Sequence, residues 1–409
     1  MATTILCPYC SRVFRNSEAI YQCTNKEFRG VEEVCPSVPD QRLNDYWNEV
    51  GVPYKRFFKG RVFPWFGSKA NACKCPDCGH PSRRLCCPEC HNPLPPEMIE
   101  EGSEVISIIG DRSSGKTVYF VSLIHELRQH GYKLDIFETN PQDVSYNENT
   151  RTSVIYENMA REMFEDGILP QQTRATRPAP LIFRVSTKKK GSKGGRSIYL
   201  VFYDTAGEIF RDTNRMEEVA RYLMDSAGVI LLVDPFTMPG LRETLLEGKV
   251  LQDENYVKTN PVTVFDKLNE LVVNSGRKGL LDKPIAISFS KIDAVIEALN
   301  NLGNPYFLSG VDLEHDSSFL QTRKLNLSEI DQISGQLESV VDQRWGAGQL
   351  YASAVSRFGA DNVRLFAVSA LGCNPGANGN LPSVRPYRVL DPLVWIMYKM
   401  GGFNIPVTQ

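Results

Sequence analysis

One eight-residue motif constrains the fold of this chain more than any other feature. Residues 110–117, Gly-Asp-Arg-Ser-Ser-Gly-Lys-Thr, match the pattern G-x-x-x-x-G-K-[ST]. The motif lies between a buried strand candidate, residues 105–109, and a helix candidate, residues 117–130. In that setting, backbone N–H groups and the helix N-terminus face an anion. The motif therefore predicts a loop that binds the phosphates of a nucleotide.

The motif also assigns a role to each of its side chains. Lys116 is expected to reach the β- and γ-phosphates, and the Thr117 hydroxyl is expected to bind Mg²⁺. The remaining residues expected around the phosphates are Gly110, Asp111, Ser113, Ser114 and Gly115.

Short apolar runs alternate with helical segments after residue 104, which is typical of a mostly parallel sheet covered by helices on both faces. The later strand candidates are residues 133–137, 181–186, 198–203, 229–233, 284–289 and 363–368. The helix candidates are residues 152–164, 262–273 and 327–358. We therefore expect a three-layer α/β domain over residues 104–409, a linker at 93–103 and a separate cysteine-rich module over residues 1–92.

Composition excludes several other classes of protein. The 409 residues carry a net charge of −2, so no global basic field indicates nucleic-acid binding. No run approaches the ~20 apolar residues of a membrane helix, and the first residues do not resemble a secretory signal. We expect a cytoplasmic protein that makes no use of a membrane.

Three further motifs follow the phosphate loop, each at the expected end of a strand. Asp204 can hold Mg²⁺ through water, and Gly207 can offer its backbone N–H to the γ-phosphate. Ser290-Lys291-Ile292-Asp293 supplies a carboxylate that can accept the two hydrogen bonds donated by guanine N1 and N2, with the Lys291 stem against the base. Ser369-Ala370 can place a backbone N–H near guanine O6.

These motifs, in this order, resemble the series found in Ras-like and translation-factor-related GTPases. The resemblance implies binding of GTP and GDP with Mg²⁺, and hydrolysis in which Glu208 stands where Ras-like proteins have a water-orienting Gln. It also implies a switch threonine before the strand at 181, for which Thr173 is favoured and Thr176 is the alternative. Ser290 replaces the usual Asn or Thr, and the long spacings indicate insertions near 132–165, 238–275 and 300–358.

Cysteine clustering predicts metal sites in the N-terminal part. Ten of the eleven cysteines precede residue 91, and three C-P-x-C knuckles begin at Cys7, Cys75 and Cys87. Such knuckles point two thiolates at one ion. We expect one zinc site from Cys75, Cys78, Cys87 and Cys90, and a second from Cys7, Cys10, Cys23 and Cys35. The remaining candidates are Cys73, Cys86, His80 and His91.

Zinc sites joined to a GTPase domain with insertions resemble the architecture of bacterial double-GTPase proteins in conflict (defence-type) systems. By that resemblance, the protein would be a nucleotide-regulated component of a multi-protein system, acting on partner proteins. We expect it to work as a switch that hydrolyses GTP slowly on its own, because no preassembled arginine finger is evident in the sequence. Nucleic acid is a less favoured partner, because the module has no dense basic stripe. Two alternatives remain: an ATP-driven P-loop enzyme, and a scaffold that binds GTP without hydrolysing it and contacts protein or nucleic acid through its zinc ribbon.

Overall fold

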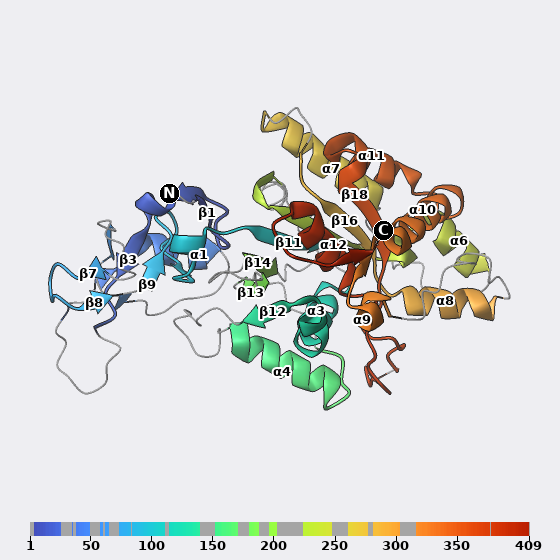
Figure 1. Cartoon of the computed structure of the whole chain (residues 1–409), viewed down its shortest axis with the longest axis horizontal. Coiled ribbons are helices and arrows are strands. Elements are labelled where there is room, and N and C mark those ends of the chain that lie inside the picture. The colour runs from blue at the N-terminus through green and yellow to red at the C-terminus, as the bar shows by residue number, and fades with distance from the viewer. Residues whose placement is uncertain are drawn as a thin grey trace.

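The computed structural model describes residues 4–25, 35, 38–49, 58–59, 62–64, 73–82, 84–110, 114–139, 152–170, 180–187, 196–202, 224–247, 261–276, 281–302, 316–376 and 378–408. A small cysteine-rich part and a larger α/β part lie side by side, at the left and right of Figure 1.

A seven-stranded sheet forms the centre of the larger part, in the order β12-β13-β14-β11-β15-β16-β18. The strands are β11 (Val105–Gly110), β12 (Ile136–Thr139), β13 (Leu181–Thr187), β14 (Ser197–Phe202), β15 (Gly228–Val233), β16 (Ile285–Phe289) and β18 (Val363–Ala367). From β14 to β18 every pair is parallel, and β13 alone runs against its neighbours. The mostly parallel sheet predicted from the alternating pattern is confirmed.

Helices cover both faces of this sheet. Side chains alternate between the two faces of each strand, so strands that are apolar throughout present apolar side chains on both faces. On β15, Ile230 and Leu232 pack in a core with α3 (Lys116–His130), α4 (Thr152–Phe164) and α12 (Asp391–Met400). Val229 and Leu231 face the opposite core. The helices of that core are α6 (Pro239–Glu247), α7 (Pro261–Asn274), α8 (Ile292–Asn301), α10 (Leu327–Gln343) and α11 (Gly348–Phe358).

Short elements complete this part of the chain. They are η3 (Gly131–Leu134), η6 (Pro235–Thr237), α9 (Phe319–Thr322), β17 (Leu325–Asn326), η9 (Ala360–Asn362) and β19 (Val407–Thr408). The three segments expected as insertions carry η3, β12 and α4, then α6 and α7, then α9 to α11.

Two predicted elements differ in detail from the structure. The helical stretch at 327–358 is divided, since α10 ends at Gln343 and α11 begins at Gly348. Gly346 takes a φ of 64° in the break, and Trp345 is fully buried there. The strand expected at 133–137 starts later, because η3 occupies its first residues and Asp135 adopts a left-handed φ of 55° before β12.

The cysteine-rich part is built from short strands. Its main sheet has the order β10-β9-β3-β6, from β3 (Ile20–Gln22), β6 (Val62–Pro64), β9 (Arg84–Cys86) and β10 (Pro93–Leu94). The other elements are β1 (Thr4–Leu6), β2 (Val13–Arg15), η1 (Asn16–Glu18), β4 (Val38–Pro39), α1 (Gln41–Glu49), β5 (Phe58–Lys59), β7 (Cys73–Lys74), β8 (Pro81–Ser82) and α2 (Met98–Glu101). The stretch expected as a linker, 93–103, thus contains β10 and α2, and its Leu94 and Met98 are fully buried.

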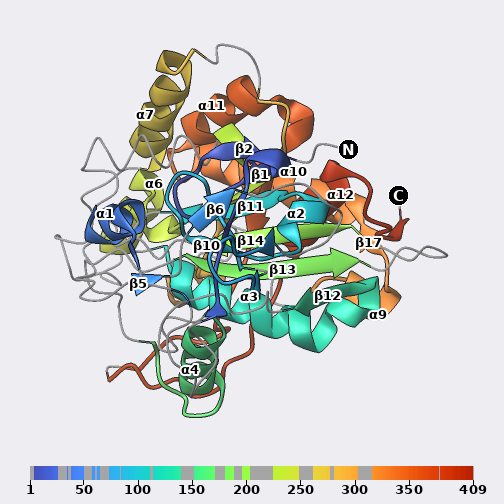
Figure 2. The same ribbon diagram turned by 90° about the vertical axis from the view of Figure 1, so that its left-hand side faces the viewer.

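This cysteine-rich part covers one face of β13 and β14. Phe183, Leu200 and Phe202 pack toward α3 and α4. Ile182, Tyr199 and Val201 point the other way, into the same buried cluster as the cysteines of the N-terminal part. Seen from that side, the N-terminal strands lie in front of β13 and β14 (Figure 2). Both faces of the strand pair are therefore buried.

Candidate functional site

The predicted motifs meet at the carboxyl edge of the parallel sheet. Gly110 ends β11, Asp234 follows β15, and Ser290 follows β16. Val368 and Ser369 follow β18 in the same way. Because these four strands are consecutive neighbours in the sheet, segments far apart in sequence lie along one edge, where ligands of open α/β sheets bind.

The phosphate loop is described at its two ends, Gly110 and residues 114–117, whereas Asp111 and Ser113 lie outside the described residues. A Cβ on Gly110 would lie 2.5 Å from the Leu232 carbonyl oxygen and 2.6 Å from Ser114 Oγ, so no larger residue fits. Gly115 has a φ of 71°, which favours glycine. The loop therefore needs both of its glycines to turn from β11 into α3.

The loop leads directly into the first turn of α3. Lys116 and Thr117 are the first two residues of this helix, and Lys116 is buried. The N–H groups of a first helical turn have no partner within the helix and carry partial positive charge. The arrangement can therefore bind an anion at the place where the motif predicts phosphates.

Lys291 connects the base-reading motif to the phosphate loop. The Lys291 backbone has a left-handed φ of 54°, and the Lys291 ammonium lies 2.8 Å from Asp234 Oδ2. The Asp234 side chain is buried, and its Oδ1 accepts a hydrogen bond from the Phe236 N–H at 3.0 Å. The Lys291 Cε would lie 4.0 Å from a Cβ on Gly115. The Lys291 stem therefore lies beside the phosphate loop, oriented by a carboxylate on the neighbouring strand end.

Sequence reasoning missed Asp234, although a signal for it exists. An Asp-Pro pair follows the buried run of β15, and Asp commonly caps a turn before proline. Its pairing with Lys291 depends on β15 and β16 being neighbours in the sheet, which no spacing in the sequence reveals.

Ser290, the first residue of the predicted base-reading motif, makes its described hydrogen bonds to the neighbouring strand. The residue is buried, and its N–H and hydroxyl both donate to the Val233 carbonyl, at 3.0 and 3.3 Å. Ser290 thereby ties the end of β16 to the end of β15, which fixes the start of the Lys291–Asp293 segment.

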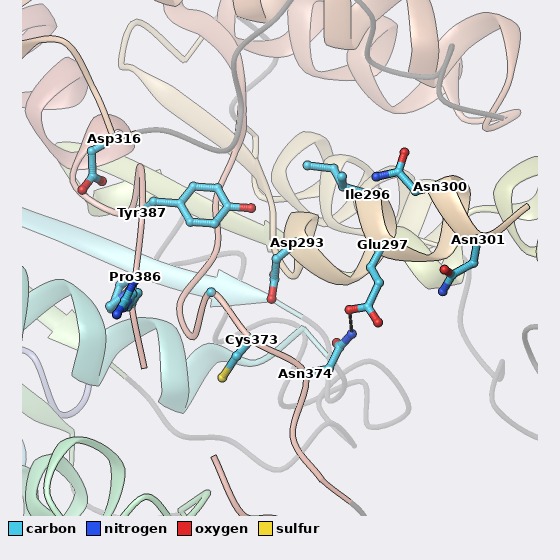
Figure 3. A pocket seen from close by; sticks show the side chains of 12 residues that line it. Asp293, Ile296, Glu297, Asn300, Asn301, Asp316, Cys373, Asn374, Pro386 and Tyr387 are labelled. Carbon is cyan, nitrogen blue, oxygen red and sulfur yellow. Dashed lines mark hydrogen bonds between the residues drawn. The ribbon is translucent and has the colours of Figure 1, made fainter. Parts of the chain in front are cut away.

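Asp293 lies in the first turn of α8 and projects into a cavity of about 620 Å³ (Figure 3). Burial raises the pKa of its carboxyl above the ordinary value, and a hydrogen bond from the Ser369 hydroxyl partly opposes this. The cavity continues along one face of α8 past Glu297, whose carboxylate accepts a hydrogen bond from the Asn374 amide. A planar ring with two adjacent N–H donors can meet the Asp293 carboxylate from this cavity.

The loop after β18 is held on several sides. The Ser369 N–H donates to the Tyr387 carbonyl at 3.1 Å, and the Gly372 N–H donates to Ser369 Oγ at 2.8 Å. The Ser122 hydroxyl of α3 donates to the Ala370 carbonyl at 2.6 Å. The predicted base-reading residues Asp293, Ser369 and Ala370 are thus brought together.

The predicted switch and catalytic residues Thr173, Thr176, Asp204, Gly207 and Glu208 lie outside the described residues. Their assignments stay predictions. The strands that precede or follow them, β13 and β14, are described and join the same sheet edge.

All eight predicted zinc ligands fall into two clusters of four, but the predicted pairing of the knuckles is wrong. Within each cluster all four sulfur atoms lie within 4.8 Å of one another. The first cluster is Cys7, Cys10, Cys87 and Cys90, and the second is Cys23, Cys35, Cys75 and Cys78. The sheet explains why the knuckles pair differently from the prediction. Strand β9 pairs with both β3 and β10, and this pairing places the knuckle that starts at Cys87 beside the N-terminal strands.

The sulfur spacing in both clusters fits tetrahedral zinc. Sγ–Sγ distances are 3.7 Å for Cys7–Cys90, 3.7 Å for Cys10–Cys87, 3.6 Å for Cys23–Cys78 and 3.8 Å for Cys35–Cys75. A tetrahedron with Zn–S bonds of about 2.3 Å has edges of about 3.8 Å, whereas a disulfide is far shorter. The Tyr9 N–H donates to Cys7 Sγ and the Glu89 N–H donates to Cys87 Sγ, each at 3.4 Å, and such bonds orient thiolate ligands toward a metal ion.

The other candidate ligands lie outside both clusters. Cys73 and Cys86 are buried but belong to neither. His91 places its Nδ1 2.9 Å from the buried Asp40 carboxylate. The Asn92 amide oxygen accepts a hydrogen bond from Trp47 Nε1 at 3.0 Å. These last two contacts attach α1 to the knuckle of the first cluster.

Together the sheet order, the glycine-bounded loop and the two strand-end motifs define a P-loop protein of the GTPase class, with two four-cysteine clusters at its N-terminus. The sequence model of the Double-GTPase 2 family matches residues 104–343, more than half of the chain. The chain belongs to this family.

One curated protein is related over most of its length. It is the "Putative ESX-1 scaffolding and assembly protein SaeC" of Mycolicibacterium smegmatis, 26% identical over 339 residues that cover 78% of this chain and 80% of the relative. None of the described helices is long and apolar enough to cross a membrane.

Two solved structures of the Saccharomyces cerevisiae Ski7 GTPase-like domain are also similar. The GTP-bound form is 13% identical with a TM-score of 0.30, and the form with GDP and inorganic phosphate is 14% identical with a TM-score of 0.28. Each match covers 73% of this chain and spans half the length of the Ski7 chain.

Proposed function

We propose that this protein binds GTP and hydrolyses it slowly, and that the bound nucleotide switches its contacts with partner proteins. The observation that carries the proposal is the meeting of the phosphate loop, Lys291, Asp293 and the Ser369–Ala370 loop along one sheet edge. Phosphate binding and guanine reading need these groups at this spacing, and family membership agrees with both.

In this proposal, each end of the nucleotide has its own residues. The phosphates lie over the first turn of α3, where Lys116 adds positive charge. The base lies against the Lys291 stem, with N1 and N2 donating to Asp293 and O6 near Ala370. Thr117 and Asp204 would hold Mg²⁺, which neutralises charge on the phosphate oxygens when bound.

Slow hydrolysis follows from the residue proposed to orient water. Glu208 carries a negative charge near phosphate oxygens, where an uncharged Gln would meet less repulsion. A partner that supplies a cation would relieve this repulsion. Turnover is therefore expected to be low for the chain alone and higher with such a partner.

The switch proposal rests on what covers β13 and β14. We treat residues 1–92 and 104–409 as two units joined by 93–103. Arg184 of β13 makes two hydrogen bonds, at 2.6 and 3.2 Å, to the carboxylate of Glu101, which lies in the joining segment at the end of α2. The proposed Thr173 precedes β13 and the proposed Glu208 follows β14. A change in either segment on hydrolysis would reach the zinc part through these strands.

Partner proteins are the proposed targets of the switch. The name of the M. smegmatis relative describes scaffolding and assembly, which is work done on other proteins. We propose a bacterial multi-protein system, of the conflict type suggested by the sequence, as the setting. A cytoplasmic location is part of the proposal, since reduced cysteines are the form that binds zinc.

A time course of phosphate release from GTP tests hydrolysis. The purified chain should release phosphate slowly, and Thr117→Ala should abolish the release by removing a proposed Mg²⁺ ligand. If GTP binds tightly but no phosphate appears over hours, with or without candidate partners, the chain is the GTP-binding scaffold and the switch proposal fails.

A further inference from the structure

One side chain links the phosphate end of the site to its base end. Ser122 lies on α3, six residues after Lys116, and is fully buried. Its hydroxyl does not donate to a backbone carbonyl of α3, as serine hydroxyls in helices often do. It donates instead to the Ala370 carbonyl at 2.6 Å, across a separation of 248 residues. The helix that begins at the phosphate loop therefore also holds the loop after β18.

This contact and one other fix two successive peptide planes. The Ala370 carbonyl shares its plane with the Leu371 N–H, and the Ser369 carbonyl shares its plane with the Ala370 N–H. Ser122 holds the first carbonyl, and the Tyr387 N–H holds the second at 2.9 Å. In a trans peptide the N–H points opposite to the carbonyl. Both N–H groups are therefore directed away from α3 and Tyr387.

Neither of these two N–H groups finds an acceptor among the described residues, although Ala370 and Leu371 are half-buried. Backbone donors removed from water are nearly always bonded. Asp293 lies beside them, since Ser369 hydrogen-bonds its carboxylate. The site thus holds two fixed donors next to one fixed acceptor, which is the complement of the O6, N1 and N2 edge of guanine.

We propose that Ser122 is a positioning residue that sets specificity for the purine 6-position. This inference rests on the proposed function and names a determinant of it. By holding the Ala370 carbonyl, Ser122 keeps the Leu371 donor directed at O6, beside the Ala370 donor that Tyr387 fixes through the Ser369 carbonyl. Adenine presents an amino group at the same position, so donors would face donors. Ser122 acts through the loop on O6, whereas Asp293 acts on N1 and N2.

Nucleotide analogues separate these two roles. Inosine triphosphate keeps O6 and N1–H but lacks the N2 amine. 6-Thioguanosine triphosphate keeps N1–H and the amine but replaces O6 with a weakly accepting sulfur. Equilibrium affinities of wild type, Ser122→Ala and Asp293→Asn for these two analogues and GTP therefore report each edge of the base separately.

Ser122→Ala should weaken GTP and inosine triphosphate by about tenfold, the effect of about one hydrogen bond. The same change should weaken 6-thioguanosine triphosphate by no more than about threefold. Asp293→Asn is the matched control with the opposite pattern. It should weaken GTP and the thio analogue by the same factor as each other, and inosine triphosphate by a smaller factor. Ser122→Cys, which keeps a weak donor of similar size, should fall between wild type and Ser122→Ala.

A guanine-selective wild type in which Ser122→Ala loses all three nucleotides equally, or none, overturns the inference and leaves the proposed function standing. A wild-type chain that binds ATP as tightly as GTP overturns the proposed function, and the inference with it. Thermal unfolding of each variant with its zinc bound confirms that the affinities refer to folded protein.

Discussion

Asp293 and Lys291 stand two residues apart but depend on different parts of the fold. The Lys291 ammonium is held by Asp234 at the end of the neighbouring strand, and Asp293 is held by Ser369 from the strand beyond. The sequence predicted both residues, because a short motif after a buried run is visible in the chain. It could not predict their supports, since Asp234 and Ser369 are 57 and 78 residues away from Lys291 and become neighbours only through the sheet order.

The raised pKa of Asp293 predicts an acid limit to GTP binding. Guanine N1 and N2 donate hydrogen bonds, so binding requires the carboxylate and not the carboxylic acid. Because burial raises the pKa of Asp293, the acid form appears at higher pH than for an exposed aspartate. GTP affinity should be constant at high pH and fall by up to about tenfold per pH unit once the pH drops below this pKa.

Titration of GTP affinity for wild type against Asp293→Asn measures this effect. The residual binding of the variant should be flat over the interval in which wild type loses affinity. Parallel pH profiles for the two proteins would show that another group causes the loss.

At the scale of elements, the strands themselves were easier to predict from the sequence than the elements that pack against them. The apolar run of β14 indicates burial on both faces, and the structure buries Tyr199 and Leu200 on opposite sides. The covering of Tyr199 by a cysteine-rich part was not predictable, because the pattern states only that something apolar lies there. The predicted pairing of the zinc knuckles was wrong for a related reason. Closeness in sequence favoured one site from residues 75–78 and 87–90, but the pairing of β3 with β9 brings residues 87–90 to the knuckle that starts at Cys7.

Two double variants distinguish the observed from the sequence-based pairing of cysteines. Cys7→Ser with Cys87→Ser removes two ligands from one cluster, so about one zinc ion per chain should remain. Cys75→Ser with Cys87→Ser removes one ligand from each cluster, so little tightly bound zinc should remain. Zinc content after gel filtration gives the answer. The reverse order, with more zinc in the second variant, would restore the pairing expected from sequence.

At the scale of the whole molecule, the cysteine-rich part, called the zinc part here because of its two clusters, takes the place of a helix over β13 and β14. Helices such as α7 and α11 cover β15, β16 and β18 on this face, and the buried cluster around the cysteines covers β13 and β14. Because the zinc part shares a core with these strands, we do not expect it to move as a freely tethered domain. The overall α/β architecture was predictable from alternating strands and helices, whereas this packing of two parts was not.

Breaking one contact between the parts tests whether nucleotide state reaches the zinc part. In hydrogen–deuterium exchange, peptides from residues 4–25 and 84–102 should differ between the GTP-analogue and GDP states of wild type. Arg184→Ala, which removes the hydrogen bonds to Glu101, should reduce that difference. The effect should be modest, since a partly exposed ion pair contributes about 0–1 kcal/mol.

Arg364→Ala is the matched control, because Arg364 makes a comparable ion pair with Asp331 at 2.7 Å, away from the zinc part. It should leave the exchange difference unchanged. Identical exchange of the two nucleotide states in wild type would contradict coupling through β13 and β14.

The central claim is that this sheet edge reads guanine through Asp293. The most direct test is the affinity of wild type and Asp293→Asn for GTP, ATP and xanthosine triphosphate in the presence of Mg²⁺. We predict that wild type prefers GTP, and that Asp293→Asn lowers GTP affinity roughly 100-fold while favouring xanthosine triphosphate, whose 2-oxo group accepts where guanine donates. Equal binding of ATP and GTP by wild type, with no change in Asp293→Asn, would contradict the claim and favour an ATP-driven P-loop enzyme.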